Sequence, residues 1–451
     1  MLSGISRCPR CERGAVHEGP AGYICDRCSA GYPILGGVPW LFRDPQGAAA
    51  EWRARLALLL ADLRADARAC QAGIADAPGA LTRQRLELLA GALDDHAQRL
   101  ASLLEPLGVD ADPSAREALQ ALRTRLPGSQ GLTNYYANIH RDWCWGEAEN
   151  EATLALLAAV ADGDLAGARI AVLGSGAGRL AYDLYSSFAP ALVVAMDLNP
   201  LLLAVAREMY AGRRLELYEL PIAPRSIADH AVLRRLHAPA AADRRLVLVA
   251  GDALQAPFAP GAFDVVVTPW FIDIVEAPFP ALAARVNALL KTGGRWLNLG
   301  SVAFASAQRA QQFSLEETLQ LAEEAGFDPP RTREEPLPYM RSPASRHARV
   351  ESTVAWSARK RAEVPAPAAH EPPVWLADVT QPVPLPAELR SHALATRIHA
   401  FLMSLVDGQR SVADIARVLV EQKLMRPEDA TPAVRAFLAR MYEDLGRRTN
   451  F

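Results

Sequence analysis

The stretch Arg169-Ile-Ala-Val-Leu-Gly-Ser-Gly-Ala-Gly-Arg179 decides the fold of this chain. An apolar run typical of a buried strand stops at a turn that holds Gly174, Gly176 and Gly178, and a helical pattern follows. Glycine suits such a turn because it adopts positive φ and lets a ligand approach the bare backbone. A second apolar run ends in Asp197, where an acid can accept hydrogen bonds from both hydroxyls of a ribose. The pattern therefore predicts an α/β domain that binds a nucleoside cofactor.

Three further features follow the glycine-rich turn in a fixed order. Residues 247–252 are typical of a third strand, which ends in Asp252, and residues 263–273 are typical of a fourth strand that runs into a loop. Residues 289–300 contain a Lys-Thr-Gly-Gly turn and a fifth strand. This order resembles the class I S-adenosylmethionine-dependent methyltransferases, and the glycines lack the phase of a dinucleotide-binding motif. The resemblance implies a Rossmann-like, seven-stranded α/β fold with S-adenosylmethionine as cofactor.

Several short motifs within residues 131–358 point to a narrower family. They are Asn134-Tyr-Tyr-Ala-Asn-Ile-His-Arg-Asp-Trp143, Ala177-Gly-Arg-Leu-Ala181, Asp197-Leu-Asn-Pro-Leu-Leu-Leu203, Trp270-Phe-Ile-Asp273 and Trp296-Leu-Asn-Leu-Gly300. In this order they resemble the carnosine N-methyltransferase-like family. The resemblance implies an N-methyltransferase whose acceptor is an amine, an imidazole or a short peptide.

The family resemblance also implies which residues hold the cofactor. Asn138 and Arg141 would reach its methionyl part, with Arg141 pairing the carboxylate in a bidentate way. The alternative for Arg141 is a salt bridge with Asp142. Asp252 and Ala253 would contact the adenine. The full set of implied cofactor-binding residues is Asn138, Arg141, Gly174, Gly176, Gly178, Asp197, Asp252 and Ala253.

The resemblance implies that Asp273 binds the methyl acceptor and acts as the catalytic residue. It follows the fourth strand directly, and an ordinary exposed loop carboxylate is the alternative. Trp270 and Phe271 make the surroundings too apolar for an ordinary exposed loop. His140 is the next candidate for the catalytic role. Four aromatic residues upstream of the glycine turn form either a lid or part of the core: Tyr135, Tyr136, Trp143 and Trp145.

The chain departs from the family at one substrate position. The family has a histidine that helps hold an imidazole substrate shortly after the fifth strand, and Ala305 stands at that position here. His347 is a possible replacement, although its basic, loop-like surroundings favour a solvent-facing side chain. The departure puts carnosine itself in doubt as the acceptor.

Two Cys-x-x-Cys pairs near the N-terminus predict a metal site. Cys8 and Cys11 form the first pair, and Cys25 and Cys28 form the second. Four thiolates in two tight turns suit tetrahedral Zn²⁺ in a closed, structural site. A redox dithiol or a chance arrangement is the alternative. The module resembles the small zinc-ribbon proteins that activate methyltransferases in trans, here fused to the chain.

Length and composition bound the remaining possibilities. The chain has 451 residues, 50% of them hydrophobic, and a net charge of −3. Such a length predicts two to four domains. The weak net charge argues against nucleic acid as a partner. No apolar run is long enough for a membrane span, and no signal-peptide core is evident. We therefore expect a cytoplasmic protein, whose oligomeric state the sequence leaves open.

The sequence predicts four segments along the chain. A helical region rich in alanine and leucine is interrupted near Pro78-Gly79 and near Asp112-Pro113. The C-terminal segment resembles the helical part of PqqD-like winged-helix modules, and a helical cap or dimerisation element is the alternative. The segments are a zinc ribbon (1–44), the helical region (45–130), the methyltransferase domain (131–362) and the C-terminal helical, winged-helix-like module (374–451).

Three functional hypotheses follow from these patterns. The first is an N-methyltransferase acting on a small amine, imidazole or short peptide. The second is a methyltransferase of protein, ribosomal peptide or RNA that docks its substrate through the ribbon and the C-terminal module. The third is a binding protein with a degenerate cofactor site, against which the intact glycines and the acids Asp197 and Asp252 argue.

Overall fold

The computed structural model describes residues 2–109, 135–275, 277–304, 309–365, 380–385 and 387–449. The chain divides into two compact units, Met1–Ala368 and Ala369–Phe451. Within these described ranges, no helix has the length and apolar character that crossing a membrane requires.

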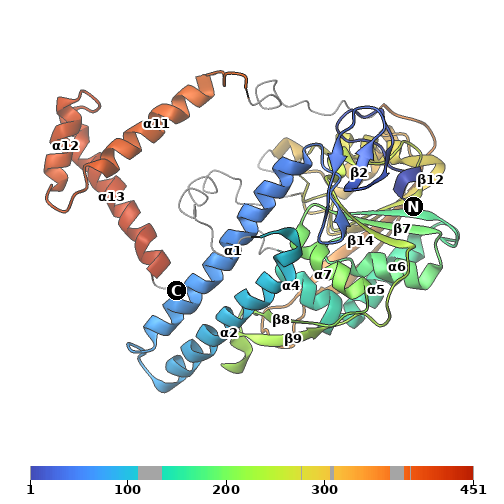
Figure 1. Cartoon of the computed structure of the whole chain (residues 1–451), viewed down its shortest axis with the longest axis horizontal. Helices are drawn as coiled ribbons and strands as arrows, with labels where there is room; N and C mark the ends of the chain where they lie inside the picture. The colour runs from blue at the N-terminus through green and yellow to red at the C-terminus, as the bar shows by residue number, and fades with distance from the viewer. Residues whose placement is uncertain are drawn as a thin grey trace. The chain divides into compact units, whose positions relative to one another are not determined.

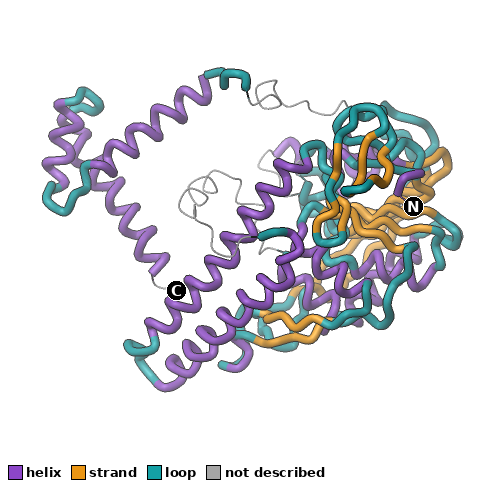
Figure 2. Tube along the Cα trace, viewed as in Figure 1, coloured by secondary structure: helices purple, strands orange, loops and turns teal. Residues whose placement is uncertain are grey.

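A seven-stranded sheet forms the centre of the first unit (Figure 2). Its strand order is β10-β7-β6-β11-β12-β14-β13, and only β14 runs antiparallel to its neighbours. This arrangement confirms the predicted Rossmann-like class I methyltransferase fold. The strands are β6 (Arg169–Leu173), β7 (Leu192–Asp197), β10 (Leu246–Ala250), β11 (Phe263–Pro269), β12 (Leu290–Gly300), β13 (Arg331–Tyr339) and β14 (Arg349–Arg359).

The central strands are apolar on both faces because both faces of the sheet are covered. Ile170 and Val172 of β6 point into one hydrophobic core, and Ala171 and Leu173 point into the other. The first core is completed by α5 (Glu147–Val160), α6 (Arg179–Phe188) and α7 (Pro200–Tyr210), and the second by α8 (Phe279–Leu289) and α9 (Leu315–Glu324).

The N-terminal ribbon packs on the second face of the sheet, beside its edge strand β10. The Leu41 N–H donates to the Ala250 carbonyl (2.8 Å), and the Ala259 N–H donates to the Ile5 carbonyl (2.8 Å). Residues 251–262, between β10 and β11, contain only the short 3₁₀ turn η6 (Ala253–Gln255). The ribbon consists of η1 (Leu2–Gly4), β1 (Val16–Gly19), β2 (Gly22–Cys25), β3 (Gly31–Tyr32), β4 (Ile34–Leu35) and β5 (Val38–Pro39).

Two long helices form the hairpin predicted between the ribbon and the sheet (Figure 1). Helix α1 (Pro45–Gly73) begins at Asp44, whose side chain accepts from the Gly47 N–H, and α2 (Ala80–Leu104) begins after Gly79. The predicted interruption at Pro78-Gly79 is thus confirmed, and the one at Asp112-Pro113 lies outside the described residues. Leucines and alanines at helical spacing pack between the two helices: Leu56, Leu60, Leu63, Ala67, Leu93, Ala97, Leu100 and Leu104.

A strand hairpin within residues 213–245 was not predicted. It pairs β8 (Leu215–Glu219) with β9 (Val232–Leu236) and lies against α2, where Arg99 forms an ion pair with Glu216 (3.3 Å). The shorter helical elements of this unit are η2 (Glu105–Leu107), α4 (Tyr136–His140), the π-helical turn η4 (Arg141–Trp145), η5 (Ala228–His230) and η7 (Arg309–Gln311).

The described part of the second unit is helical. It contains α11 (Ala387–Ser404), α12 (Val412–Glu421) and α13 (Pro427–Thr449). Ser411 and Asp414 form a capping box at the start of α12, in which each side chain accepts the backbone N–H of the other residue. A small core that includes Leu402, Ile415 and Leu419 joins the helices. The described residues of this unit contain no strand, so the resemblance to a winged helix stays a hypothesis.

Candidate functional site

The predicted site residues follow the carboxyl ends of the parallel strands. From β6 the chain passes outward to β7 and β10, and then returns to β11 on the other side of β6. Open α/β sheets bind ligands in the crevice at such a switch point. The glycine turn (residues 174–178) follows β6 and the loop that holds Asp273 follows β11, so the two lie on either side of this crevice.

The three glycines of the turn have different roles, although all adopt positive φ. A Cβ atom on Gly174 would overlap the Phe271 ring, and one on Gly178 would overlap the Tyr210 hydroxyl. A Cβ atom on Gly176 would meet no atom within 4 Å. Gly174 and Gly178 are therefore required by packing, whereas Gly176 faces open space where a ligand can approach the backbone.

Asp197 lies beside Gly176. Its Oδ2 accepts the Gly176 N–H (2.8 Å), and its Oδ1 accepts the Asn199 N–H (2.8 Å). Each oxygen keeps a lone pair for another donor. Burial raises the pKa of Asp197 to about 6. The neighbouring Ser175 Oγ is buried and has no hydrogen-bond partner within the described part of the chain, so the turn retains hydrogen-bonding capacity.

Asp252 lies just beyond the carboxyl end of β10, where Ala250 pairs in register with Asp197. Its Oδ1 accepts the Leu254 N–H (2.8 Å) and so caps the turn η6. Burial raises the pKa of Asp252, and Ala253 beside it is buried. The two acids predicted to hold the nucleoside thus follow neighbouring strands.

Arg141 lies in the π-helical turn η4, a local structure that is frequent at functional sites. Its Nε and Nη2 both donate to Asp142 Oδ1 (2.9 and 2.6 Å), and Nη1 lies 3.6 Å from Glu149 Oε1. The ion pair with Asp142 is the alternative that the sequence left open, and the cofactor-binding role stays a prediction. Asn138, three residues earlier, lies half-buried on the same side of the helix.

Among the described residues, Asp273 accepts hydrogen bonds through one of its two oxygens. Its Oδ2 accepts the Ala303 N–H (2.8 Å) and the Ser301 hydroxyl (3.2 Å). Trp270 and Val302, which flank these contacts in the chain, have φ of +49° and +53°. Positive φ is strained for residues other than glycine, and such strain tends to gather at functional sites. The family's histidine position, Ala305, lies outside the described residues.

An aromatic side chain that the sequence did not single out lies between these groups. Tyr339 ends β13, and its ring lies 4.7 Å from that of Trp270. The Arg141 and Arg349 guanidinium carbons lie 5.8 and 4.5 Å from the centre of the Tyr339 ring. Because β13 runs parallel to β12, the same carboxyl-end rule would have pointed to Tyr339 if this strand had been predicted.

Tyr135 lies close to both predicted binding regions. Burial raises the pKa of its hydroxyl, and repulsion from Tyr339, Asp197 and Asp273 raises it further. Asp197 ends β7 and Asp273 follows β11, so the cofactor acid and the acceptor acid lie at the same edge of the sheet. The hypothesis of a lid does not extend to Trp143, which is buried in the core.

His140 lies away from this region, in a buried cluster between α2, α4 and β8. Its Nε2 lies 3.1 Å from the Tyr218 carbonyl, so the neutral ring carries its proton on Nε2. Nδ1 of His140 and Nδ1 of His96 are buried without partners among the described residues. Burial lowers the pKa of His96 to about 4 and that of His140 to about 3. The surroundings of His140 fit a structural role.

We expect His140→Gln to weaken the pH dependence of stability. Between pH 6.5 and 4 the unfolded chain protonates histidines that the folded protein keeps neutral, so the free energy of unfolding should fall with the pH. Asp197, whose pKa is raised, has the opposite effect in both proteins. Glutamine can still donate to the Tyr218 carbonyl. Denaturant unfolding between pH 7 and 5 measures the slope, and identical slopes in the two proteins would contradict this account.

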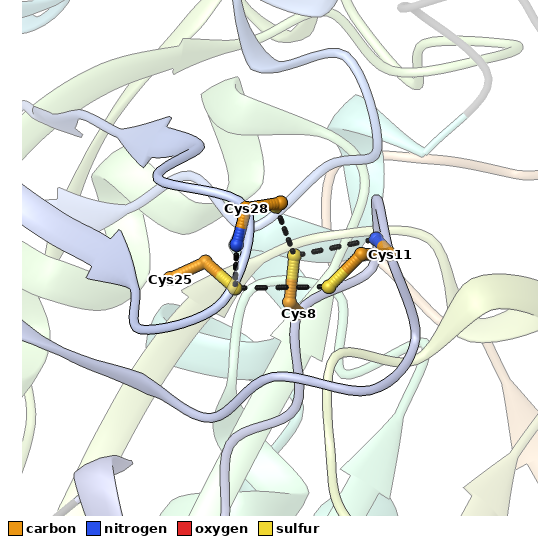
Figure 3. A group of neighbouring side chains, drawn as sticks. All are labelled: Cys8, Cys11, Cys25 and Cys28. Atoms are coloured by element: carbon orange, nitrogen blue, oxygen red, sulfur yellow. Dashed lines mark hydrogen bonds between the residues drawn. The ribbon is translucent and has the colours of Figure 1, made fainter.

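The four N-terminal cysteines form one cluster (Figure 3). The Sγ atoms of Cys8 and Cys28 are 3.7 Å apart, as are those of Cys11 and Cys25. All four lie within 4.8 Å of one another. Four thiolates about 2.3 Å from a tetrahedral Zn²⁺ are separated by about 3.8 Å. The spacing therefore fits the predicted zinc site.

The backbone around the cluster also favours thiolates. The Cys11 N–H points at Cys8 Sγ, and the Arg27 and Cys28 N–H groups point at Cys25 Sγ, all at 3.4 Å. A Cβ atom on Gly14 would overlap Cys25 Sγ, so glycine is required there by close packing. Zn²⁺ in this site would have a structural role, because four protein ligands leave no position for water.

We expect about one zinc per chain, lost in Cys8→Ala. Because the ribbon shares a core with the sheet, this variant should also lower the melting temperature of the first unit. Metal analysis and thermal unfolding measure the two effects. Cys144→Ala, at an exposed cysteine outside the cluster, is the matched control and should change neither. Wild-type protein that carries no metal when freshly purified would refute the assignment.

Comparisons with known proteins agree with this fold. Residues 172–297 match a family model described as a methyltransferase domain. This match covers the glycine turn, Asp197, Asp252 and Asp273, so the chain contains a methyltransferase domain of the class I, Rossmann-like fold. No curated protein matches the chain in sequence.

Several solved structures are similar in fold. One is Haemonchus contortus phosphoethanolamine N-methyltransferase 2 with phosphomonomethylethanolamine and S-adenosylhomocysteine (17% identity, TM-score 0.35). The match covers 53% of this chain and 61% of that enzyme. Another belongs to the Haloferax volcanii complex of the Trm112 methyltransferase activator with a methyltransferase (13% identity, 51% of this chain, 98% of that chain, TM-score 0.34). The carnosine N-methyltransferase-like resemblance and the likeness of the ribbon to activator proteins stay hypotheses.

Proposed function

We propose that this protein is an S-adenosylmethionine-dependent methyltransferase that N-methylates an amine, an imidazole or a short peptide. The observation that carries the proposal is the convergence of an open glycine turn, Asp197 and Asp273 at the switch point of a methyltransferase domain. The glycine turn and Asp197 suit a nucleoside, and Asp273 suits a nitrogen that carries a proton.

The groups around the glycine turn fit S-adenosylmethionine. Gly176 leaves space above the backbone, and the Ser175 hydroxyl needs a partner. Asp197 would accept both ribose hydroxyls through its remaining lone pairs, and Asp252 would accept from the adenine amino group. Arg141 would pair with the methionyl carboxylate through Nη1. This nitrogen lies 3.6 Å from Glu149, farther than Nε and Nη2 lie from Asp142.

The sulfonium of the bound cofactor would supply both the methyl group and the leaving group. The task of the protein is to hold a neutral acceptor nitrogen in line with the methyl carbon and to exclude water. Asp273 orients the acceptor by accepting its N–H at Oδ1, because Oδ2 is engaged by Ala303 and Ser301. The same carboxylate takes the proton that the nitrogen loses as its new C–N bond forms. The rings of Trp270 and Tyr339 shield this step from solvent.

The packing of the ribbon weighs against the alternative, a methyltransferase that docks a macromolecule through its ribbon. Leu2, Ile5 and Leu41 of the ribbon share one core with Val194 and Val249 of the sheet. These residues are therefore engaged in completing the fold. A structural role for the ribbon accounts for these buried apolar residues without a docked substrate.

We expect Asp197→Ala to weaken S-adenosylmethionine binding by at least tenfold, because two hydrogen bonds to a charged acceptor are lost, each worth about 1.5–3 kcal/mol. The affinity of the wild type should also fall below pH 6, where Asp197 takes up a proton. Calorimetry measures both effects. Asp162→Ala, an exposed acid at the opposite edge of the sheet, is the charge-matched control. Unchanged affinity in Asp197→Ala would exclude the ribose role.

We expect Asp273→Asn to slow methyl transfer about 10²–10⁴-fold, the range for a positioned acid or base. Cofactor affinity should stay within a few-fold, because the amide keeps the shape of the side chain. Ser301→Ala is the matched control, since it removes one hydrogen bond to Asp273 but keeps the carboxylate. Single-turnover transfer of a labelled methyl group measures the rates. A rate near that of the wild type in Asp273→Asn would assign the proton transfer to another group.

A further inference from the structure

Two loops far apart in sequence are joined beside the candidate acceptor site. Residues 220–227 belong to the loop between β8 and β9, and residues 340–348 connect β13 to β14. The Arg225 N–H donates to the Ala344 carbonyl (3.2 Å), and the Arg346 N–H donates to the Ala223 carbonyl (2.9 Å). The Arg346 guanidinium also donates to the Arg225 carbonyl (2.8 Å). These bonds fix the two loops against each other.

The joined loops carry four exposed arginines, which we call the arginine rim: Arg225, Arg341, Arg346 and Arg349. Of these, only Arg349 forms an ion pair within the described residues, with Glu351. The acid next along the first loop, Asp229, accepts from the Ser226 hydroxyl at 2.7 Å. The exposed His347 lies in the same loop as Arg341 and Arg346. The rim therefore has a net positive charge, although the whole chain has a net charge of −3.

The rim borders the wall of the acceptor site. The Arg349 guanidinium carbon lies 4.5 Å from the centre of the Tyr339 ring, whose other contacts include Trp270, three residues before Asp273. Arg341 follows Tyr339 by two residues. The loop is fixed at this point, because the Met340 N–H donates to Glu149 (3.0 Å). The charges of the rim are thus attached to the same short segment as the aromatic wall.

Unpaired arginines at the entrance of a site attract anions and bind carboxylate or phosphate groups through charge-assisted hydrogen bonds. They repel an acceptor that carries only a positive charge. Asp273 follows Trp270 in the chain, and Arg349 of the rim lies over Tyr339, whose ring contacts that of Trp270. The carboxylate and the arginines together suit a molecule with a nitrogen at one end and an anionic group at the other.

We propose that the methyl acceptor carries a carboxylate or phosphate group and that the arginine rim holds this group. The inference rests on the proposed function in placing the acceptor nitrogen at Asp273. It goes further in naming the chemical class of the acceptor and the residues that select it.

The test measures binding of short fluorescent peptides to the full chain in the presence of S-adenosylhomocysteine. Three amidated peptides share one histidine and differ in two positions: two glutamates, two phosphoserines or two glutamines. We expect each anionic peptide to bind at least tenfold more tightly than the glutamine peptide. The tighter of the two anionic peptides shows whether carboxylate or phosphate is preferred.

The double variant R341E/R346E should remove this preference, because both arginines are exposed and have no acid partner within the described residues. R244E/R361E makes the same charge change at the opposite edge of the sheet and should keep the preference. Equal binding of charged and neutral peptides by the wild type would overturn the proposal, as would a preference that survives in R341E/R346E. Tighter binding of an RNA oligonucleotide than of either anionic peptide would also overturn it.

Calorimetry with S-adenosylmethionine separates this inference from the proposed function. R341E/R346E should bind the cofactor as the wild type does, because neither arginine contacts the glycine turn or Asp197. A wild type that fails to bind the cofactor would contradict the proposed function. In that case the peptide binding, measured also without S-adenosylhomocysteine, would still show whether the rim binds anions.

Discussion

The packing of the cysteine-bearing ribbon against the edge strand β10 is the interaction on which the rest of the structure depends. Parallel strands are usually joined by a helix that covers the sheet. Between β10 and β11 this chain has only a short 3₁₀ turn, and ribbon residues such as Ile5 and Leu41 cover that face instead. A module of about 40 residues gains little stability from burial alone, so the cysteine cluster must hold it together. Loss of the cysteine cluster should therefore also disturb the edge strand β10, which positions Asp252.

The switch point of the sheet explains why groups distant in sequence meet. Four parallel strands, β6, β7, β11 and β13, each bring one feature to the same edge: the glycine turn, Asp197, the loop of Asp273, and Tyr339. Of the two loops that flank the switch point, the one on the acceptor side contains a non-glycine residue with positive φ, Trp270, and Val302 beside Asp273 adopts positive φ as well. The cofactor side uses glycine where positive φ is required. The cofactor half of the site is thus built without strain at its turn, whereas the acceptor half depends on the surrounding packing to hold its loop.

The sequence predicted those parts of the molecule that local patterns encode. Apolar runs marked the five strands of the large sheet that lie between residues 169 and 300, and acids at strand ends marked Asp197 and Asp252. Tyr339 and Arg349 were not predicted as site residues, because their position depends on the pairing of β13 with β14 and not on a local motif. The hairpin β8–β9 was not predicted, because its strands are short and carry many charges. The role of Trp143 could not be read from sequence, since a buried aromatic and a lid aromatic look alike there.

The arginine rim offers an explanation for Ala305, the position at which this chain differs from the carnosine N-methyltransferase-like family. The carnosine N-methyltransferase-like family, which this chain resembles in sequence, has an imidazole-binding histidine where this chain has Ala305. If the resemblance extends to the acceptor, recognition of its ring would lose one polar contact. Recognition at the other end of the molecule can replace it. An anionic group on the arginine rim would fix the acceptor at a distance from Asp273, and binding energy gained there orients the reacting nitrogen. A neutral nitrogen tethered to an anion also avoids the repulsion that a purely cationic amine would meet at the entrance. In this proposal the chain would recognise the acceptor by its charge where the carnosine N-methyltransferase-like family recognises it by its ring.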